Sequence, residues 1–538
     1  MRILTYEIWE SGGVVGARNT DGGIVVSSDP LRILEFLRYS GGGNIRAFWG
    51  LHENIATLLK MLPQSVLQSL VDNPKARARH DKYEIYFRPR YSIFGCGRTN
   101  FYSLETFFQN EPEPPTLEAV QAKADELAST LADCGLGGFR KLTSPIAIFR
   151  DSDWGKEFYE SFPKTPELPA SIQEAVEYAR QCDSREWVTA YQLGHWREGE
   201  CFEYDLSSAH PSCALDLPHL RDMQFWKSDT INNREWNATM GFLHGTMTLY
   251  PDAKYQYCSP IMAKVDGRNC NPAGVLDDYF TLDEVRFVRQ HGLGEFRLTD
   301  GWFLSPYHSI YPPTPLRDIL EKFYIMRSKS NVAAMLGKQL AVQLIGDLIA
   351  KHENNPSYVG IRNEIYHATI LARTRLKVAR FLIENKITKD ELICVQTDNC
   401  RLTRQVPVPV HNGMGKWQYR GSQPTIVASP VRVYSGARKP YSLTYNDLIN
   451  EIQKHPAGFY YGRRVPRRTT LRQALELEDI SLVGTVGKVE AHLNLDEIPL
   501  ETNRDFPKLP ETGHGLLNNK FMSDPVVLQR RKCDTRRQ

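Results

Sequence analysis

Two aspartates that lie far apart in the sequence have settings suited to metal-ion chemistry. Asp205 ends the apolar, strand-like segment CFEYD, and small and polar residues follow it up to Pro211. Asp398 lies between two further strand-like segments, ELICVQ and CRLTR. If these strands are neighbours in one sheet, the two carboxylates meet at its edge, where such a pair can hold the two divalent ions that drive in-line phosphoryl displacement. Mg²⁺ suits this site because it prefers oxygen ligands and shares its coordination sphere with substrate phosphates.

Each aspartate also has a purely local explanation. Asp-Asn favours turns, so Asp398 is equally explained as a turn residue, and Asp205 as the N-cap of whatever follows it. A helical hairpin between them favours the chemical interpretation, because LRDILEKFYIMR and VAAMLGKQLAVQLIGDLIAK both show helical periodicity. Arg327 lies near the end of the first helix and Lys338 on the second. Two cations facing a metal site are what the phosphates of a nucleoside triphosphate require.

The elements that must position these residues form a mixed pattern of strands and helices. The segments RILTYEIW, GGIVVSS and IRAFWG read as strands, KYEIYFRP and YSIFGCG as a hairpin, and a helix is predicted over about 116–134, ended by Gly135. This opening predicts a compact α/β unit. The stretch over 151–200, with FPKTPELP, is connecting in character. A third helix is predicted over about 365–385, directly before the two strands that flank Asp398.

The composition indicates a large folded protein. The chain has 538 residues, of which 41% are hydrophobic, 24% charged and 11% aromatic, which excludes disorder for most of its length and allows several structural units. It contains no apolar run of about 18 residues, and its start, MRILTYEIWE, does not resemble a signal peptide. We therefore expect a soluble, cytoplasmic protein. Its ten cysteines lack CxxC pairs, which argues against a zinc site or a disulfide framework.

The formal net charge is only +3, but basic residues are clustered. One group comprises Arg463, Arg464, Arg467, Arg468 and Arg472, and the tail carries Arg530, Arg531, Lys532, Arg536 and Arg537. Local basic patches on a nearly neutral chain suggest contact with a polyanion, although a solvated tail explains the last cluster equally well.

Several motifs, taken in order, resemble those of family B DNA polymerases, particularly the small phage and plasmid members that use a protein primer. YDLSSAHPS at 204–212 resembles the first palm motif, DxxSLYPS, and LGKQLAVQLIG at 336–346 the fingers motif, KxxxNSxYG. VQTDN at 395–399 resembles the second palm motif, YxDTDS. ARKPY at 437–441 resembles KxY, and YQLGH at 191–195 is a weaker match to YxGG.

This resemblance covers most of residues 190–520 and implies roles for individual residues. Asp205 and Asp398 would be the catalytic carboxylates and would bind two Mg²⁺ ions, with Mn²⁺ as a substitute. The nucleotide-binding residues would be Arg327, Lys338, His210 and Leu206. Contacts with the primer and the DNA would come from Lys439, Tyr441, Arg463, Arg464, Arg467 and Arg468.

The sequence also departs from the family pattern. His210 falls where the family has its sugar-selecting tyrosine, which puts sugar discrimination in question. Val342 and Ile345 replace the usual asparagine and tyrosine of the fingers motif, and Gln396 and Asn399 replace the first aspartate and the serine of DTDS. Because Asp398 matches the metal-binding aspartate, we expect activity to survive.

The amino-terminal unit resembles the family's ribonuclease-H-like proofreading nuclease. Its first motif, DxE, appears as Thr5-Tyr6-Glu7, and in its third motif Gln121 replaces tyrosine while Asp125 remains. Such a site needs about four carboxylates around two metal ions. We therefore expect a nuclease-shaped domain without nuclease activity, in which Glu7 and Asp125 are ordinary surface or capping acids.

The resemblance implies an α/β and α+β multidomain fold, with a ribonuclease-H-like domain followed by a right-hand polymerase of palm, fingers and thumb. The expected boundaries are 1–150 for the nuclease-like domain, 151–200 for a linker, 201–312 for the palm with an insertion, 313–360 for the fingers hairpin, 361–440 for the rest of the palm, and 441–538 for the thumb and basic tail.

The function expected from these features is that of a template-directed DNA polymerase that extends a primer 3′-hydroxyl with dNTPs and lacks proofreading. Its partners would be primer–template DNA, dNTPs and a terminal protein or another replication protein, without a membrane, in the cytoplasm of a bacterial host. Two alternatives remain open. One is a primase-like or ribonucleotide-tolerant polymerase, suggested by His210, and the other a DNA-binding protein of polymerase shape that has lost catalysis.

Overall fold

The chain forms two compact units, which we describe separately. The first comprises Met1–Ser161, Glu321–Leu344 and Gly462–Glu490, and the second Phe162–Leu320, Ile345–Tyr461 and Ala491–Gln538. The computed structural model describes all residues except 1, 74, 89–92, 109–113, 140, 183–185, 266–267, 309–312, 330, 350–359, 410–412, 430–431, 436–449, 451–453, 455–458, 484–485, 494–500, 506–523, 528 and 531–538.

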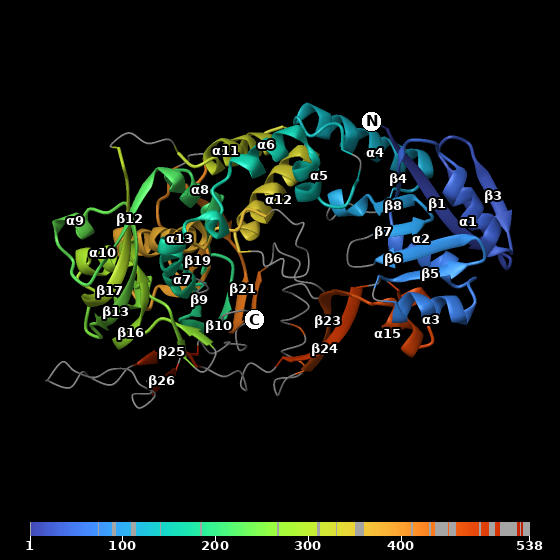
Figure 1. Ribbon diagram of the computed structural model, residues 1–538. Helices are drawn as coiled ribbons and strands as arrows, with labels where there is room; N and C mark the ends of the chain where they lie inside the picture. Colours follow the sequence, from blue (N-terminus) through green and yellow to red (C-terminus); the bar gives the residue numbers. More distant parts are fainter. Residues whose placement is uncertain are drawn as a thin grey trace. The chain divides into compact units, whose positions relative to one another are not determined.

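An eight-stranded sheet with the order β3-β2-β1-β4-β8-β7-β6-β5 organises the first unit (Figure 1). Its central strands β1, β4 and β8 are parallel, and the outer pairs are antiparallel. The strands are β1 (Ile3–Ser11), β2 (Val14–Asn19), β3 (Ile24–Ser27), β4 (Ile45–Phe48), β5 (Arg77–His80), β6 (Tyr83–Arg88), β7 (Ile93–Cys96) and β8 (Thr99–Ser103). The helices are α1 (Pro30–Tyr39), α2 (Leu51–Leu59), α3 (Gln64–Asp72) and α4 (Leu117–Asp133).

Local sequence signals account for the bounds of α4, as predicted. Thr116 begins the helix, because its hydroxyl accepts a hydrogen bond from the backbone N–H of Ala119. Gly135 follows the helix with a φ of 74°, a left-handed conformation that glycine adopts without steric penalty. Strands β6 and β7 form the predicted hairpin. The sequence pattern does not predict strand β2, because its glycine and arginine interrupt the run of apolar residues.

The predicted helical hairpin is present as α11 (Leu316–Met326) and α12 (Asn331–Asp347). Gly337 lets the two helices approach closely, because a Cβ atom at this position would lie only 2.3 Å from the carbonyl oxygen of Phe323. The ring of Phe323 contacts Phe149 and Trp154, with centroid distances of 5.3 and 5.6 Å. These two residues belong to α5 (Pro145–Asp151) and α6 (Asp153–Ser161), so the hairpin packs on helices of the same unit.

Residues 151–200, which the sequence analysis treats as a linker, contain regular elements. They hold α6, α7 (Gln173–Cys182), β9 (Val188–Ala190) and β10 (Gln192–Trp196). Helix α7 buries Ala175, Val176 and Ala179, and Trp187 is completely buried just before β9. The prolines and charged residues around this short apolar stripe hid its helical period.

The second unit contains a five-stranded sheet with the order β20-β11-β19-β18-β9. Its neighbours β11 (Phe202–Leu206), β18 (Leu392–Gln396), β19 (Asn399–Leu402) and β20 (Trp417–Ser422) are antiparallel. Tyr204, Val395 and Leu402 belong to the same core as Ala379 and Leu382 of the long helix α13 (Glu364–Glu384). Helix α13 therefore covers one face of this sheet, and it lies at the predicted position.

Two four-stranded sheets also belong to the second unit. The order β12-β17-β13-β16 joins β12 (Met223–Ser228), β17 (Gly294–Pro306), β13 (Met240–Leu249) and β16 (Gly274–Thr281), next to α10 (Leu282–Gln290). The order β22-β21-β10-β27 joins β10 to β21 (Thr425–Ser429), β22 (Arg432–Ser435) and β27 (Gln529–Arg530). Further elements of the second unit are α8 (Ala209–Ala214), α9 (Asn233–Trp236) and two strand pairs, β14 (Ala263–Val265) with β15 (Arg268–Cys270) and β25 (Glu501–Asp505) with β26 (Asp524–Val527). Helix α15 (Leu471–Glu476) belongs to the first unit, and the paired strands β23 (Phe459–Arg468) and β24 (Val486–Leu493) lie mostly within it. None of the helices with described residues is both long and apolar enough to cross a bilayer.

We predict that Tyr204→Phe destabilises the second unit by about 1–3 kcal/mol, because it leaves buried backbone groups unpaired. The Tyr204 hydroxyl donates to the carbonyl oxygen of Val406 at 3.1 Å and accepts from its N–H at 2.7 Å. Urea denaturation measures the loss. Tyr419→Phe, at a position 38% exposed, is the control, and equal stability of the two variants would contradict the prediction.

Candidate functional site

Strand β11 places Asp205 beside the turn that carries Asp398. In the antiparallel pair of β11 and β19, Asp205 lies opposite Asn399. The N–H of the next residue, Leu206, donates to the carbonyl oxygen of Asp398 at 2.9 Å. The two aspartates therefore occupy adjacent positions at one end of the sheet, and both side chains are partly exposed. Leu206 is itself buried.

Two of the six described non-glycine residues with left-handed backbone flank these aspartates. Thr397, directly before Asp398, has a φ of 58°, and Ser208, shortly after Asp205, has a φ of 48°. This conformation costs on the order of 1–3 kcal/mol and persists only where the surroundings hold it, which is common at functional sites. The N–H of Thr397 is held by the carbonyl oxygen of Trp187 at 2.7 Å.

Strand β20 lies on the other side of β11 and brings a cation to Asp205. Nε and Nη2 of Arg420 donate to Oδ2 of Asp205 at 3.2 and 2.5 Å. The Asp205 side chain is 19% exposed and that of Arg420 43%. The guanidinium therefore compensates the carboxylate from the solvent side, and a metal ion bound to the same oxygen would compete with it.

The donor set fits Mg²⁺, because Asp205 and Asp398 offer carboxylate oxygens from adjacent strands and magnesium completes its octahedron with water and substrate phosphates. Within the described parts of the chain, no group of three or more histidine, cysteine, aspartate or glutamate residues is arranged to hold a metal ion. The remaining ligands would therefore come from substrate and water.

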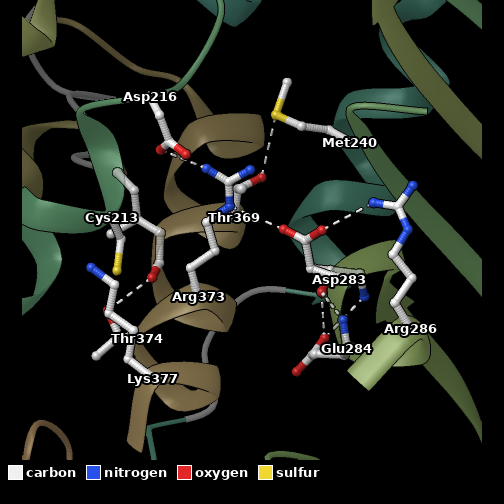
Figure 2. A network of polar contacts seen from close by, with 12 residues as sticks. Cys213, Asp216, Met240, Asp283, Glu284, Arg286, Thr369, Arg373, Thr374 and Lys377 are labelled. Atoms are coloured by element: carbon white, nitrogen blue, oxygen red, sulfur yellow. Dashed lines mark hydrogen bonds and ion pairs between the residues drawn. The ribbon is translucent and has the colours of Figure 1, made fainter. Parts of the chain in front are cut away.

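Figure 2 shows how α13 holds the segment that follows Asp205. Arg373 of α13 donates to Asp216 at 2.9 Å and to Asp283 at 3.0 Å. One turn further along the helix, Nζ of Lys377 donates to Oγ of Ser212 at 2.8 Å. These contacts attach α8 and the residues after it to the helix that covers the sheet.

His210 lies in α8, where its side chain is partly buried. Burial, together with the nearby His367, lowers the pKa of His210 to about 4. The imidazole is therefore neutral at pH 7 and presents uncharged bulk.

The other predicted nucleotide-binding residues belong to the first unit. Lys338 and Val342 are both exposed on α12, and their spacing of four residues puts them on one face of the helix. Arg327 follows α11 and is also exposed, with its guanidinium 5.5 Å from the ring of Tyr324. Their role in nucleotide binding stays a prediction.

The predicted DNA contacts are not tested by the structure. Lys439 and Tyr441 lie outside the described residues. Strand β23 contains the backbone of Arg463, Arg464, Arg467 and Arg468. Their contacts with DNA stay predictions.

Sequence reasoning missed a buried ion pair behind the two aspartates. Glu203 of β11 and Arg401 of β19 are directly opposite one another, with Nη2 of Arg401 3.1 Å from Oε2 of Glu203. They are only 5% and 2% exposed. One signal in the sequence is that each of the apolar segments CFEYD and CRLTR contains a charged residue, Glu203 and Arg401. Strand alternation places Glu203 on the same face as Asp205, and Arg401 on the same face as Asn399.

In the first unit, the polar residues at the nuclease-like motif positions have partners within the unit. Glu7 lies opposite Arg18 across β1 and β2, with Nη2 of Arg18 2.7 Å from its carboxylate. The Oε1 atom of Gln121 accepts from the N–H and the hydroxyl of Thr5 at 3.1 and 3.0 Å. Its Nε2 donates to Asp125 at 2.9 Å. The two remaining acids thus contact a guanidinium and an amide, beside a cavity of about 480 Å³ lined by Arg2, Arg18, Gln121 and Asp125, among others.

We predict that His210 makes the protein less stable as the pH falls. Between pH 6.5 and about 4 an unfolded histidine binds a proton, whereas the folded one stays neutral. The unfolded state then binds more protons, so the free energy of unfolding falls through this window, by about 3 kcal/mol for this residue. Urea denaturation at several pH values should show a shallower pH dependence for His210→Gln, but an unaltered one for the exposed control His308→Gln. Identical slopes for all three proteins would contradict the assignment.

Comparison with known proteins shows what this geometry belongs to. Neither a protein-family model nor a curated protein matches the sequence. Solved structures of Phi29 DNA polymerase do match. Its ternary complex with primer-template DNA and incoming nucleotide substrates has a TM-score of 0.56 and 11% sequence identity, over 92% of this chain and 99% of that chain. Its complex with single-stranded DNA has a TM-score of 0.53 and 11% identity, over 92% and 100% of the two chains.

The similarity covers 92% of this chain, so it includes parts of both units. The α/β and α+β multidomain class is confirmed, and so is the resemblance as far as it concerns the fold. This chain has the multidomain fold of Phi29 DNA polymerase.

Proposed function

We propose that the chain is a template-directed DNA polymerase that extends the 3′-hydroxyl of a primer with dNTPs. The observation that carries this proposal is the adjacency of Asp205 and Asp398 on β11 and the β18–β19 turn. It occurs in a chain whose fold is shared with Phi29 DNA polymerase over 92% of its length. Those structures are complexes of Phi29 DNA polymerase with primer-template DNA and incoming nucleotides or with single-stranded DNA, which supports the same ligand classes here.

In this proposal Asp205 and Asp398 hold two Mg²⁺ ions, with Mn²⁺ as a substitute. When bound, the metal stabilises charge on both the attacking and the leaving oxygen of an in-line displacement at the α-phosphate. Arg420, which now contacts Oδ2 of Asp205, would have to release that oxygen for it to hold a metal ion. Lys338 would bind the triphosphate through its compact ammonium charge, and Arg327 through the paired N–H donors of its planar guanidinium. The neutral His210 would pack beside the sugar.

The rest of the proposal concerns the partners and the first unit. A terminal protein or another replication protein would join the DNA and dNTPs as partners, and the reaction would take place in the cytoplasm of a host. The first unit would lack proofreading, because Glu7 is paired with Arg18 and because Gln121 forms hydrogen bonds with both Thr5 and Asp125. Two separated acids that already have partners cannot readily hold two metal ions.

Replacing either aspartate should abolish primer extension. Asp205→Asn and Asp398→Asn keep the size of the side chain but remove the anionic oxygen that a metal ion needs, so DNA binding should stay nearly unchanged. Extension of a labelled primer–template, resolved on a gel, measures the first effect, and fluorescence anisotropy the second. Asp229→Asn, at an exposed position after β12, is the matched control. If Asp205→Asn extends primers as well as the parent protein, the proposal is wrong.

The same gel separates the alternatives. His210 favours the second candidate, a ribonucleotide-tolerant or primase-like polymerase, because an imidazole stands where sugar selection is expected. Comparable extension with rNTPs, or products without a primer, would support that candidate. DNA binding without incorporation in Mg²⁺ or Mn²⁺ would instead indicate a polymerase-shaped binding protein.

The first unit should not degrade DNA. We expect a 3′-labelled single strand to remain intact with Mg²⁺ or Mn²⁺, and Thr5→Asp alone should not create activity, because the Arg18–Glu7 pair and Gln121 remain. Release of labelled mononucleotides measures this activity. Degradation that persists in Glu7→Gln would belong to a contaminant, whereas degradation that Glu7→Gln removes would contradict the expectation.

A further inference from the structure

Polar residues cross the five-stranded sheet in two rows next to the aspartates. In the first row, Asn399 of β19 lies opposite Asp205 of β11 and opposite Gln396 of β18. In the second, Arg401 lies opposite Glu203 and Cys394. Because alternate residues of a strand point to the same face, Glu203 and Asp205 share a face, as do Asn399 and Arg401. The two rows are therefore neighbours on the face opposite α13.

Side-chain hydrogen bonds join the two rows. Arg401 donates from Nη1 to Oε1 of Gln396 at 2.7 Å and to Oδ1 of Asn399 at 3.2 Å, while its Nη2 pairs with Glu203. Asn399 donates in turn from Nδ2 to Oε1 of Glu203 at 2.7 Å. The amide of Asn399 thus accepts from the cation and donates to the anion, which a carboxylate, having no donor, cannot do.

The charges within this network compensate one another. Glu203, Asn399 and Arg401 are each 5% exposed or less, and a buried charge is tolerated only when it is paired. Burial raises the pKa of the Cys394 and Cys400 thiols, so they are neutral neighbours. Glu203 is therefore the anionic partner of Arg401 in this network.

The network holds both sides of the turn that carries Asp398. Gln396 is the last residue of β18 and Asn399 the first of β19, so one guanidinium binds the residues on either side of Thr397 and Asp398. That turn contains the strained backbone of Thr397. A rigid contact on each side is what such a conformation requires.

The geometry points to Glu203 and Arg401, acting through Asn399 and Gln396, as positioning residues that hold Asp398 against Asp205 and thereby set the affinity of the site for a divalent ion. This inference rests on the proposed function. It also gives Gln396 and Asn399, which replace the first aspartate and the serine of the second palm motif, a common role. Both are uncharged acceptors of hydrogen bonds from the buried Arg401.

Three variants test this role. Asn399→Ser removes the link between the rows without leaving a charge unpaired. Glu203→Met combined with Arg401→Met removes both charges at once, a change that buried pairs often tolerate. The control is Glu284→Met combined with Arg375→Met, which removes an ion pair of the same unit with a 2.6 Å contact and 4% and 5% exposed side chains. That pair joins α10 to α13 and includes no residue of the strands that carry the aspartates.

Two readouts distinguish positioning from stability. Hydrogen–deuterium exchange of the peptide over residues 392–402, in metal-free protein, reports on the turn. Electron paramagnetic resonance with Mn²⁺, using a dideoxy-terminated primer–template and a dNTP, reports metal binding without turnover. We expect both network variants to exchange faster in this peptide and to bind Mn²⁺ roughly 10–100-fold more weakly, as is typical when the outer partners of metal ligands are lost. The control variant should match the parent protein in both measurements.

The possible failures have different meanings. If exchange in the 392–402 peptide is unchanged in both network variants, or rises equally in the control, the positioning role is wrong. If exchange rises but Mn²⁺ affinity stays the same, the network does not set metal affinity and the inference is also wrong. If instead the parent protein shows no Mn²⁺ binding that Asp205→Asn removes, the proposed function fails, while the exchange data still decide whether the network holds the turn.

Discussion

The antiparallel register of β11 between β19 and β20 is the constraint on which the candidate site depends. In this register Tyr204 points into the core beneath α13, and the alternating residues Glu203 and Asp205 point to the opposite face. A slip by one residue would reverse every side chain of the strand and bury two acids against the apolar core. The ring of Tyr204 packs against Phe381 of α13, with centroids 5.6 Å apart. The packing of this one aromatic residue therefore specifies on which face the carboxylates of Glu203 and Asp205 lie.

Each of the two acids on β11 has its own arginine, and the two pairs differ in exposure. Arg401 comes from β19 and is buried with Glu203, whereas Arg420 comes from β20 and is 43% exposed. Separating the buried pair would leave a charge without solvent or partner, which is strongly unfavourable. Separating the exposed pair loses little, because water can solvate the released guanidinium. The inner pair therefore suits a structural role, while the outer pair can be separated at little cost.

The sequence predicted the parts of the fold whose signal is local. Helices α4, α12 and α13 follow from helical periods and caps, and the segments around Asp205 and Asp398 follow from short apolar strands. Residues 151–200 were harder, because the apolar stripe of α7 is short and lies among prolines and charges. The Glu203–Arg401 pair could not be derived from either strand alone, since its meaning depends on the register between residues far apart in the chain. The same holds for Arg420, which is an unremarkable exposed arginine until β20 pairs with β11.

The two units show the same electrostatic rule with different outcomes. In each unit a partly buried carboxylate pairs with an arginine of the neighbouring strand, Glu7 with Arg18 and Asp205 with Arg420. In the first unit, Thr5 and Gln121 stand at the expected acid and tyrosine positions and use their polar atoms on one another. The other remaining acid, Asp125, is bound to the amide of Gln121. In the second unit, displacing Arg420 would leave Asp205 beside the turn that carries Asp398, and under the proposed function two neighbouring carboxylates would favour a divalent cation over a guanidinium.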